Sequence, residues 1–340
     1  MQKTSKQNTT NSLIFLNNLR AFENNSFHKV LTDVLQLDES AVYRRTSGET
    51  SITLNEILLL LTYYKKDLNE LVPHLEHQVS LTYKPINNKS YTYDDFLHDI
   101  AIKLHHLVQN EISHCYYFAK EHPIFYNLMF APMGLFKYYV WEKSFLIGTT
   151  FEKQKFSLKE MSADTNRDDS MLLASLYLQF DTEELWGFET LMITIQQIEH
   201  YYLCDYFDTK ADALAICNSL KELINHIQLQ VEYGFKVDPK TQTPTHSKYH
   251  LYVSELTSGD NKIVITNKDN TLHVFDSSNT LHYQESTNHL FCSTIKNSIQ
   301  KMCKKSILLN HLDDKEKNKF FMKHYKKIDS LMLRIERDEF

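Results

Sequence analysis

Glycine and proline are scarce in this chain of 340 residues, which contains six of each. Extended glycine-rich phosphate-binding loops, collagen-like repeats and sheet-rich folds with many tight turns are therefore not expected. Tryptophan occurs only twice, whereas tyrosine and phenylalanine each occur 20 times. This composition indicates large helix faces that pack through aromatic rings.

Long apolar runs are absent as well. No stretch of about 18 apolar residues occurs, so the sequence predicts no transmembrane helix. The residues up to Asn11 are polar and lack the apolar stretch of a secretory signal. The five cysteines are odd in number and form no Cys-x-x-Cys pair, which is typical of a reducing compartment without structural zinc. We therefore expect a cytoplasmic protein without membrane contact.

Signatures of enzyme chemistry are missing too. The sequence has no Gly-x-Ser-x-Gly elbow, no Walker loop and no dinucleotide-binding fingerprint. Histidine is frequent, but His74 with His77, and the adjacent pair His105 and His106, lack a second metal-binding motif. We therefore predict no catalytic residue, no metal and no cofactor, and we do not expect an enzyme.

Two groups of reactive side chains have plain structural interpretations. Four glutamates lie in a segment predicted to be a helix: Glu183, Glu184, Glu189 and Glu199. Without a partner base or a pocket, they are interpreted as a solvated stripe. Cys204 and Cys217 are candidates for a thiol sensor, but inert buried cysteines explain them more simply.

Charge is distributed unevenly behind a net value of −6. Residues 1–75 carry eight basic and eight acidic side chains, whereas residues 296–327 carry ten lysines and three acids. The remaining middle of the chain is strongly acidic, and a phosphate backbone does not attract such a segment. The lysine-rich segment is interpreted as a solvated face of a terminal helix.

The first block of the chain, residues 12–75, predicts five short helices. Ser12 is the expected cap of the first helix, and the second follows with apolar residues at i, i+3 and i+4 spacing. Asp38 precedes the third helix, Glu39–Thr46, and an aspartate at this position can cap it. Gly48 follows this helix as a stop.

The fourth helix begins at a Thr-x-x-Glu capping box formed by Thr53 and Glu56, and a fifth ends before Pro73. Two short helices joined by a tight turn and followed by a capped helix have the geometry of a helix-turn-helix. Its wedge-shaped core is predicted to contain Leu31, Leu35, Leu37 and Val42. The side chains predicted to contact DNA from its second helix are Glu39, Ser40, Tyr43, Arg44 and Arg45.

This block resembles the Xre, or lambda-repressor-like, helix-turn-helix family in Leu31–Gly48, Thr53–Leu58 and Leu68–Leu71. In that family a glycine follows the recognition helix, a capped fourth helix comes next, and a Leu-x-x-Leu helix closes the domain. Gly48, Thr53 and Leu68–Leu71 occupy these places. The resemblance implies a sequence-specific DNA-binding regulator of transcription.

Four positions depart from the family pattern. Gln36 stands where a glycine is usual in the turn, so a non-glycine residue has to accept a positive φ. Thr32 replaces a small alanine at the helix crossing, and Arg45 occupies a position that is more often apolar. Glu39 brings an acid toward phosphates, although a carboxylate can accept a hydrogen bond from a cytosine amino group.

Later blocks resemble long bacterial one-component regulators, which carry an N-terminal helix-turn-helix and a large C-terminal region. These blocks are Tyr43–Arg45 with Gly48–Glu49, Phe136–Ser144, Ile195–Glu199, Lys319–Met322 and Lys327–Ile328. The resemblance implies transcriptional regulation and names no effector.

Beyond a linker at residues 76–90, the sequence predicts mostly helices. They span Thr92 to about Lys120, then 124–147, 168–180, 183–204 and 209–233, with Gly234 as a stop. Residues 238–247 are expected to be a second linker or a long loop.

The pattern changes after this loop. Strands are expected at 251–253, 262–265 and 272–275, with a fourth at 281–283, and residues 267–270 form a hairpin connection. Two helices, near 289–308 and 313–336, end the chain. The expected fold class is mainly α: a five-helix N-terminal domain, a central helical bundle, and a small antiparallel sheet at about 248–284 with two helices at the C-terminus (α+β).

The sequence therefore predicts a regulator whose residues 12–75 bind double-stranded DNA and whose residues 91–340 sense an effector or dimerise. Because residues 1–75 are neutral, useful affinity is expected to need a homodimer on adjacent half-sites. The apolar long helices after Thr92 are candidate interfaces. The alternative is a helical protein–protein interaction scaffold without specific DNA binding.

The densest aromatic block of the chain extends from Tyr116 to Trp141. One interpretation is that it forms core. The other is a pocket for a small-molecule or peptide effector, in which Lys137 fixes the orientation of the ligand.

Overall fold

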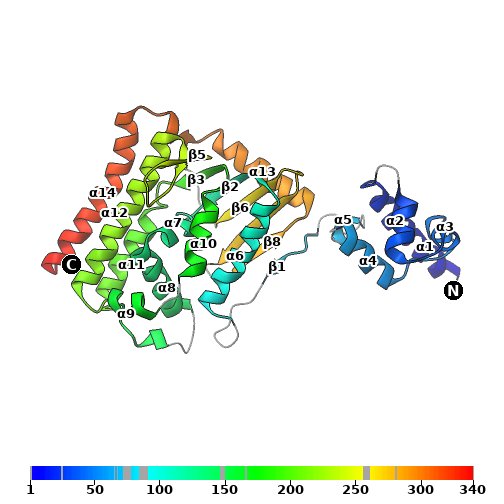
Figure 1. Cartoon of the computed structure of the whole chain (residues 1–340), viewed down its shortest axis with the longest axis horizontal. Helices are drawn as coiled ribbons and strands as arrows, with labels where there is room; N and C mark the ends of the chain where they lie inside the picture. The colour runs from blue at the N-terminus through cyan, green and yellow to red at the C-terminus, as the bar shows by residue number, and fades with distance from the viewer. Residues whose placement is uncertain are drawn as a thin grey trace. The chain divides into compact units, whose positions relative to one another are not determined.

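The computed structural model describes residues 2–23, 26–64, 66, 68–71, 78–83, 91–145, 150–164, 167–255, 261–279 and 282–339. The chain forms two compact units, Met1–Leu81 (unit 1) and Thr82–Phe340 (unit 2) (Figure 1). Most of the expected linker at residues 76–90 lies outside the described residues, but Thr82–Tyr83 within it form a short strand.

Unit 1 contains five helices within the described residues, as the sequence predicts. They are α1 (Gln2–Arg20), α2 (Phe27–Leu35), α3 (Glu39–Thr46), α4 (Leu54–Tyr64) and α5 (Leu68–Leu71). The first helix starts well before Ser12, so the predicted cap at that residue is wrong. The capping box at α4 is confirmed, because the Thr53 amide donates to Glu56 Oε2 at 2.7 Å and the Glu56 amide donates to Thr53 Oγ1 at 3.3 Å.

The core of unit 1 joins all five helices. Leu31 and Leu35 of α2 and Val42 of α3 are buried in it, and Leu37 packs against it, so the predicted wedge is confirmed. Phe15, Leu16 and Leu19 of α1, Leu60 of α4 and Leu71 of α5 complete this core. Burial of these side chains fixes the angle between α2 and α3.

Unit 2 is an α+β structure. Its helices before the last group of strands are α6 (Tyr93–Gln109), α7 (Ile124–Met129), α8 (Ala131–Phe145), α9 (Leu158–Asp164), α10 (Asp168–Tyr177), α11 (Met192–Leu203) and α12 (Lys210–Tyr233). Two further helices, α13 (His289–Cys303) and α14 (Asp314–Arg337), follow those strands. The short 3-10 turns η2 (Thr150–Glu152) and η3 (Leu309–His311) complete the helical elements of the described residues.

The strands of unit 2 form one large mixed sheet. They are β1 (Thr82–Tyr83), β2 (Ile112–Ala119), β3 (Thr182–Gly187), β4 (Phe235–Val237), β5 (Pro244–Ser254), β6 (Lys262–Asn267), β7 (Leu272–Asn279), β8 (His282–Ser286) and β9 (Ile307–Leu308). Their order is β1-β8-β7-β6-β2-β3-β5-β4, with β9 paired to β5. The neighbours β2, β3 and β5 run parallel, and β6, β7 and β8 continue the sheet antiparallel from β2.

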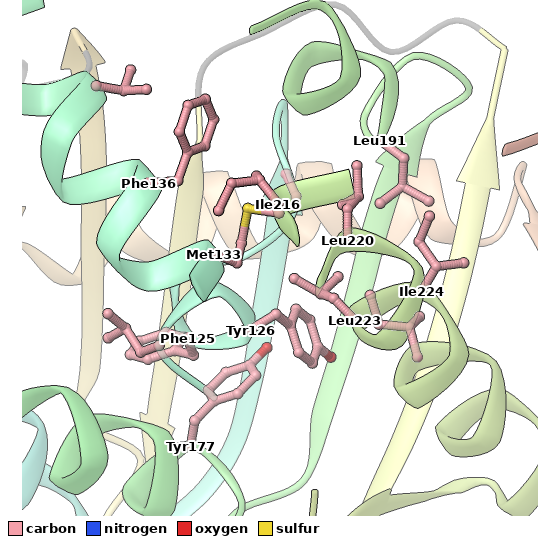
Figure 2. Packing of buried hydrophobic residues seen from close by; sticks show 14 of the residues in the cluster. Phe125, Tyr126, Met133, Phe136, Tyr177, Leu191, Ile216, Leu220, Leu223 and Ile224 are labelled. Carbon is pink, nitrogen blue, oxygen red and sulfur yellow. The ribbon is translucent and has the colours of Figure 1, made fainter. Parts of the chain in front are cut away.

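The sheet separates two cores because side chains alternate between its faces. On one face, Cys115, Tyr117 and Ala119 of β2 pack into the large core formed with α6, α7, α8, α10, α11 and α12. On the other face, Tyr116 and Phe118 pack with α13. Figure 2 shows part of the large core, where Ile216 and Leu223 of α12 lie beside Met133 and Tyr126.

The expectation of a central helical bundle is wrong, because a large sheet lies at the centre of unit 2. Residues 112–119, expected at the end of a long helix, form β2, and residues 182–187, expected in part to begin a helix, form β3. Between Cys115 and Ala119 every residue is buried. A strand covered on both faces shows a continuous apolar run instead of alternation, and such a run resembles a buried helix.

The expectation of a separate small antiparallel sheet at about 248–284 is also wrong, because these strands belong to the large sheet and β5 runs parallel to β3. The individual C-terminal elements are largely as expected. Strands β5 to β8 overlap the four expected strands, Asn267–Asn270 form the hairpin connection, and α13 and α14 follow. Helix α12 ends at Gly234, which has a φ of 71°. The expected loop at residues 238–247 is shorter, because β5 already begins at Pro244.

Candidate nucleic-acid interface

The turn between α2 and α3 has the conformation that the sequence required. Gln36 lies in the left-handed region with φ 52° and ψ 44°, and its amide donates to Thr32 O. Asp38 then caps α3, since its carboxylate accepts a hydrogen bond of 2.7 Å from the Ala41 amide. Ser40 Oγ donates to the same carboxylate at 2.7 Å. The hydrogen bonds of Ser40 and Ala41 hold the pKa of Asp38 below its ordinary value, so the cap stays ionised.

Four of the five predicted DNA-contacting residues lie on the surface of α3. Glu39, Ser40, Tyr43 and Arg44 are exposed, and Tyr43 is among the most exposed large hydrophobic residues, at 61%. Positions i, i+1, i+4 and i+5 share one face of a helix. The buried Val42 and Ala41 anchor the opposite face to the core.

Arg45 lies apart from this exposed face. Its Nη2 atom is 2.7 Å from Glu56 Oε1, and the two side chains are only 15% and 12% exposed. Its Nη1 also donates to Ala41 O at 3.1 Å. Burial raises the pKa of Glu56, but the hydrogen bonds from Arg45 and Thr53 together outweigh it and hold this pKa below its ordinary value. Arg45 therefore joins α3 to α4, and we assign it a structural role in place of the predicted DNA contact.

A broad concavity of about 1380 Å³ lies beside the exposed face of α3. Its basic lining residues are Arg20, Lys29 and Arg44, and its acidic ones are Glu23, Glu39 and Glu49. Thr32 and His28 of α2 also line it. The charges balance, so this surface attracts phosphates only weakly as a single copy.

The N-terminus of α2 opens onto the same concavity. Its N-cap residue, Ser26, makes no capping hydrogen bond with its side chain, while Phe27, His28 and Lys29 of the first turn line the concavity. Amides of a first helical turn that lack a side-chain cap are suited to bind a phosphate oxygen. Lys29 adds a positive charge at this place, and the ring of His28 adds a hydrogen-bonding group.

The interior of unit 2 contains a buried carboxylate that the sequence did not reveal. Glu184, interpreted above as part of a solvated stripe, is fully buried on β3. Its carboxylate accepts hydrogen bonds from the hydroxyls of Tyr126 (2.7 Å), Tyr177 (2.6 Å) and Tyr249 (3.2 Å), and from Trp186 Nε1 (2.9 Å). The solvated-stripe interpretation is therefore wrong for this residue, because β3 runs through the core.

Lys236 of β4 lies in the same cluster. It is fully buried, and its Nζ donates to Tyr177 O at 3.0 Å and lies 3.1 Å from the centroid of the Tyr177 ring. Burial lowers the pKa of Lys236 to about 7, although the Glu184 carboxylate opposes this shift. Burial likewise raises the pKa of Glu184. The four donors around Glu184 and the carbonyl acceptor of Lys236 indicate a structural network.

The aromatic block from Tyr116 to Trp141 forms core. Tyr126, Phe136 and Tyr139 are fully buried, and the Phe136 ring stacks on Phe207 with centroids 5.6 Å apart. Lys137 contacts Glu121 and Gln197 and donates to Thr194 Oγ1 at 3.0 Å. Lys137 therefore does not anchor the expected pocket, whereas Tyr117 and Phe125 of this block line a cavity in unit 2 between α6 and the sheet.

Other predicted features lie as follows. Cys217 is buried and Cys204 is half-buried. The apolar faces of α6 and α12, expected as dimer interfaces, are buried in the large core of unit 2. No three His, Cys, Asp or Glu side chains in the described part of the chain gather as metal ligands, and no helix there could span a membrane.

Comparison of the chain with protein-family models, with curated proteins and with solved structures finds no match.

Proposed function

We propose that the protein is a sequence-specific DNA-binding regulator of transcription of the Xre, or lambda-repressor-like, type. The observation that carries this proposal is the exposed face of α3, which stands on a rigid helix-turn-helix with a left-handed turn at Gln36 and a cap at Asp38. A recognition helix has to present its first residues outward to enter the major groove. The face of α3 meets this requirement.

Each exposed side chain of α3 has a chemical role in this proposal. Arg44 donates two hydrogen bonds to the O6 and N7 atoms of a guanine, and Glu39 accepts from the amino group of a cytosine. Ser40 and Tyr43 contact base edges or phosphates. Phosphate binding by the first turn of α2 then fixes the register of the protein on the duplex.

We further propose that the protein binds DNA as a homodimer, because the neutral surface of one unit 1 gains little from counterion release. Helix α4 offers a contact for a second copy, since Leu54 and Leu58 are 69% and 53% exposed and Leu59 and Tyr63 are also exposed. Burial of such apolar side chains between two copies favours association.

The dimer contact is tested by the substitution Leu58→Lys. Sedimentation of the full chain should show a dimer for the natural sequence and a monomer for the variant, because a lysine cannot be buried in an apolar contact without a partner. Operator affinity should fall in parallel. If Leu58→Lys is still a dimer, then α4 does not form the dimer contact.

The function itself is tested by selection of bound sequences from a random DNA pool with the full chain. Two copies of one half-site are expected in the selected sequences, spaced by about one helical turn. Gel shifts then compare Arg44→Ala with Lys240→Ala, an exposed control in unit 2. Arg44→Ala should weaken specific binding roughly 10- to 100-fold, with circular dichroism unchanged. Weak binding that ignores sequence would contradict the proposal and favour an interaction scaffold.

Unit 2 is proposed as the sensing part of this regulator. It has its own core and its own cavity, and it follows unit 1 directly along the chain. A ligand that binds one conformation of unit 2 more tightly than another shifts the equilibrium toward that conformation, and this shift is the proposed signal.

A further inference from the structure

A cavity of about 180 Å³ lies in unit 2 between α6 and the sheet. Its floor is built from cross-strand partners that point to the same face: Cys115 pairs with Ile265, Tyr117 with Ile263, and Ile263 with Phe275. The fixed register of β2, β6 and β7 therefore sets the shape of the floor. Ile100, Leu104 and Leu107 of α6 form the opposite wall.

Aromatic rings surround this space. Phe96, Phe125, Tyr177, Phe180 and Tyr283 line it in addition to the rings of the floor. Phe125 and Tyr177 stack with centroids 4.3 Å apart, and Phe275 meets Tyr283 at 5.9 Å with an angle of 60°. Such walls offer both faces and edges to another ring, the two arrangements that aromatic pairs prefer.

The size of the cavity limits its occupant. An apolar cavity of about 150 Å³ in another protein holds one benzene molecule. The space here is slightly larger, and it suits a molecule with one ring or two fused rings. A long acyl chain or a peptide is too large for it.

The polar residues of the lining are Lys103, Asn261 and Ser277. Lys103 Nζ is 2.7 Å from Glu285 Oε1, and the same oxygen is 3.0 Å from His273 Nδ1. Burial raises the pKa of Glu285, but the hydrogen bonds from His273 and Lys103 outweigh it and hold this pKa below its ordinary value. Because this carboxylate already balances the lysine, the lining favours a neutral ligand over an anion.

The cavity also adjoins the place where the chain enters unit 2. Strand β1 begins at Thr82 and pairs with β8, with Thr82 opposite Glu285 and Tyr83 opposite Gln284. Strand β8 carries Tyr283, which lines the cavity, and Glu285, which holds Lys103. A ligand that shifts β8 therefore shifts the strand that continues from unit 1.

We propose that this cavity binds a small neutral aromatic molecule, with one ring or two fused rings and one polar group, and that its occupancy regulates DNA binding through the β1–β8 pair. The regulatory half of the proposal rests on the proposed function. The binding half does not.

Binding is tested by calorimetric titration of the full chain with indole, and with benzoate and octanoate as anionic and flexible comparisons. Indole should bind once per chain and raise the melting temperature, whereas benzoate and octanoate should bind at least tenfold more weakly. Ile100→Trp, which fills the cavity, should weaken indole binding at least tenfold. Ile102→Trp on the same helix, at a position that is 57% exposed, should bind as the natural chain does.

Circular dichroism and melting verify that both variants fold, and Ile263→Phe provides a second filled cavity if Ile100→Trp does not. Undetectable indole binding to the natural chain would overturn the proposal. The proposal would also be overturned if a folded cavity-filling variant bound indole as tightly as the natural chain does, or if the natural chain bound octanoate more tightly than indole.

Regulation is tested by gel shifts of the full chain with and without saturating indole. The natural chain should change its operator affinity at least threefold, and Thr82→Pro, which removes a backbone donor from β1, should bind indole without this change. An unchanged affinity in the natural chain would overturn regulation alone. If the natural chain binds no DNA sequence specifically, the proposed function fails. The indole titration still tests whether the cavity binds an aromatic ligand.

Discussion

Adjacent side chains in this protein have opposite environments. Arg44 is exposed on α3, whereas Arg45 is paired with Glu56 inside unit 1. On β3, Glu183 and Glu184 point to opposite faces of the sheet, and only the second is fully buried. Residue type alone cannot separate such neighbours, because the helix face or sheet face decides which one meets solvent.

Glu184 is expected to stabilise unit 2 strongly. The substitution Glu184→Ala leaves three tyrosine hydroxyls and one indole without their acceptor and removes the carboxylate that favours the charged form of Lys236, so the free energy of unfolding should fall by about 3–5 kcal/mol. Glu183→Ala is the control, since Glu183 pairs with the partly exposed His114, and should cost about 1 kcal/mol or less. Urea unfolding followed by circular dichroism measures both. If the two variants lost the same free energy of unfolding, the buried network around Glu184 would add nothing to stability.

The buried histidine His226 predicts loss of stability in acid. Burial lowers its pKa from 6.5 to about 4, aided by Lys236. Between these values the unfolded chain binds more protons, so the free energy of unfolding is highest above pH 6.5 and falls as the pH drops to 4. The full shift corresponds to about 3 kcal/mol.

His226→Leu should flatten this part of the stability profile, and His246→Leu, at an exposed position, should not. Urea unfolding at half-unit pH steps measures the slope. A slope that is unchanged in His226→Leu would mean that other groups govern the acid response.

At the scale of single elements, helix ends are set by short-range chemistry. Gly234 ends α12 with a φ of 71°, and a Cβ atom at this position would meet nothing within 4 Å. Gly234→Ala should therefore cost only the backbone strain of the left-handed conformation, about 1 kcal/mol. Thermal unfolding measures this loss of stability. A loss much larger than about 1 kcal/mol would contradict the open space around the added Cβ atom.

Several caps were predictable because each depends on a few neighbouring residues. The cap at Asp38 and the box at Thr53 and Glu56 follow from local pattern, whereas the cap expected at Ser12 is wrong because α1 begins before it. The left-handed conformation of Gln36 was implied by the family resemblance. Strand β3 was not predictable in the same way. Its Thr-Glu-Glu-Leu-Trp sequence suits a helix as well as a strand, and pairing with β2 and β5 makes it a strand.

At the scale of the whole molecule, two compact units that each have their own core residues predict two unfolding transitions. Leu60 is buried in the core of unit 1 and Ile224 in that of unit 2. Leu60→Ala should lower the midpoint temperature of one transition and Ile224→Ala that of the other, because each should reduce the free energy of unfolding of its own unit by about 2–5 kcal/mol. Calorimetry of the full chain, with both variants and the natural sequence, separates the transitions. A single transition that both variants shift together would contradict this independence.

The sequence by itself determined the helices of unit 1, the exposed face of α3, the hairpin strands β6 and β7 and the two last helices, because these depend on contacts between residues close in the chain. Only the tertiary structure decided that the middle of the chain builds a large sheet, that Glu184 lies inside it and that a cavity opens beneath α6. Parallel strands meet across long intervening segments, and a strand covered on both faces has no alternating pattern to reveal it.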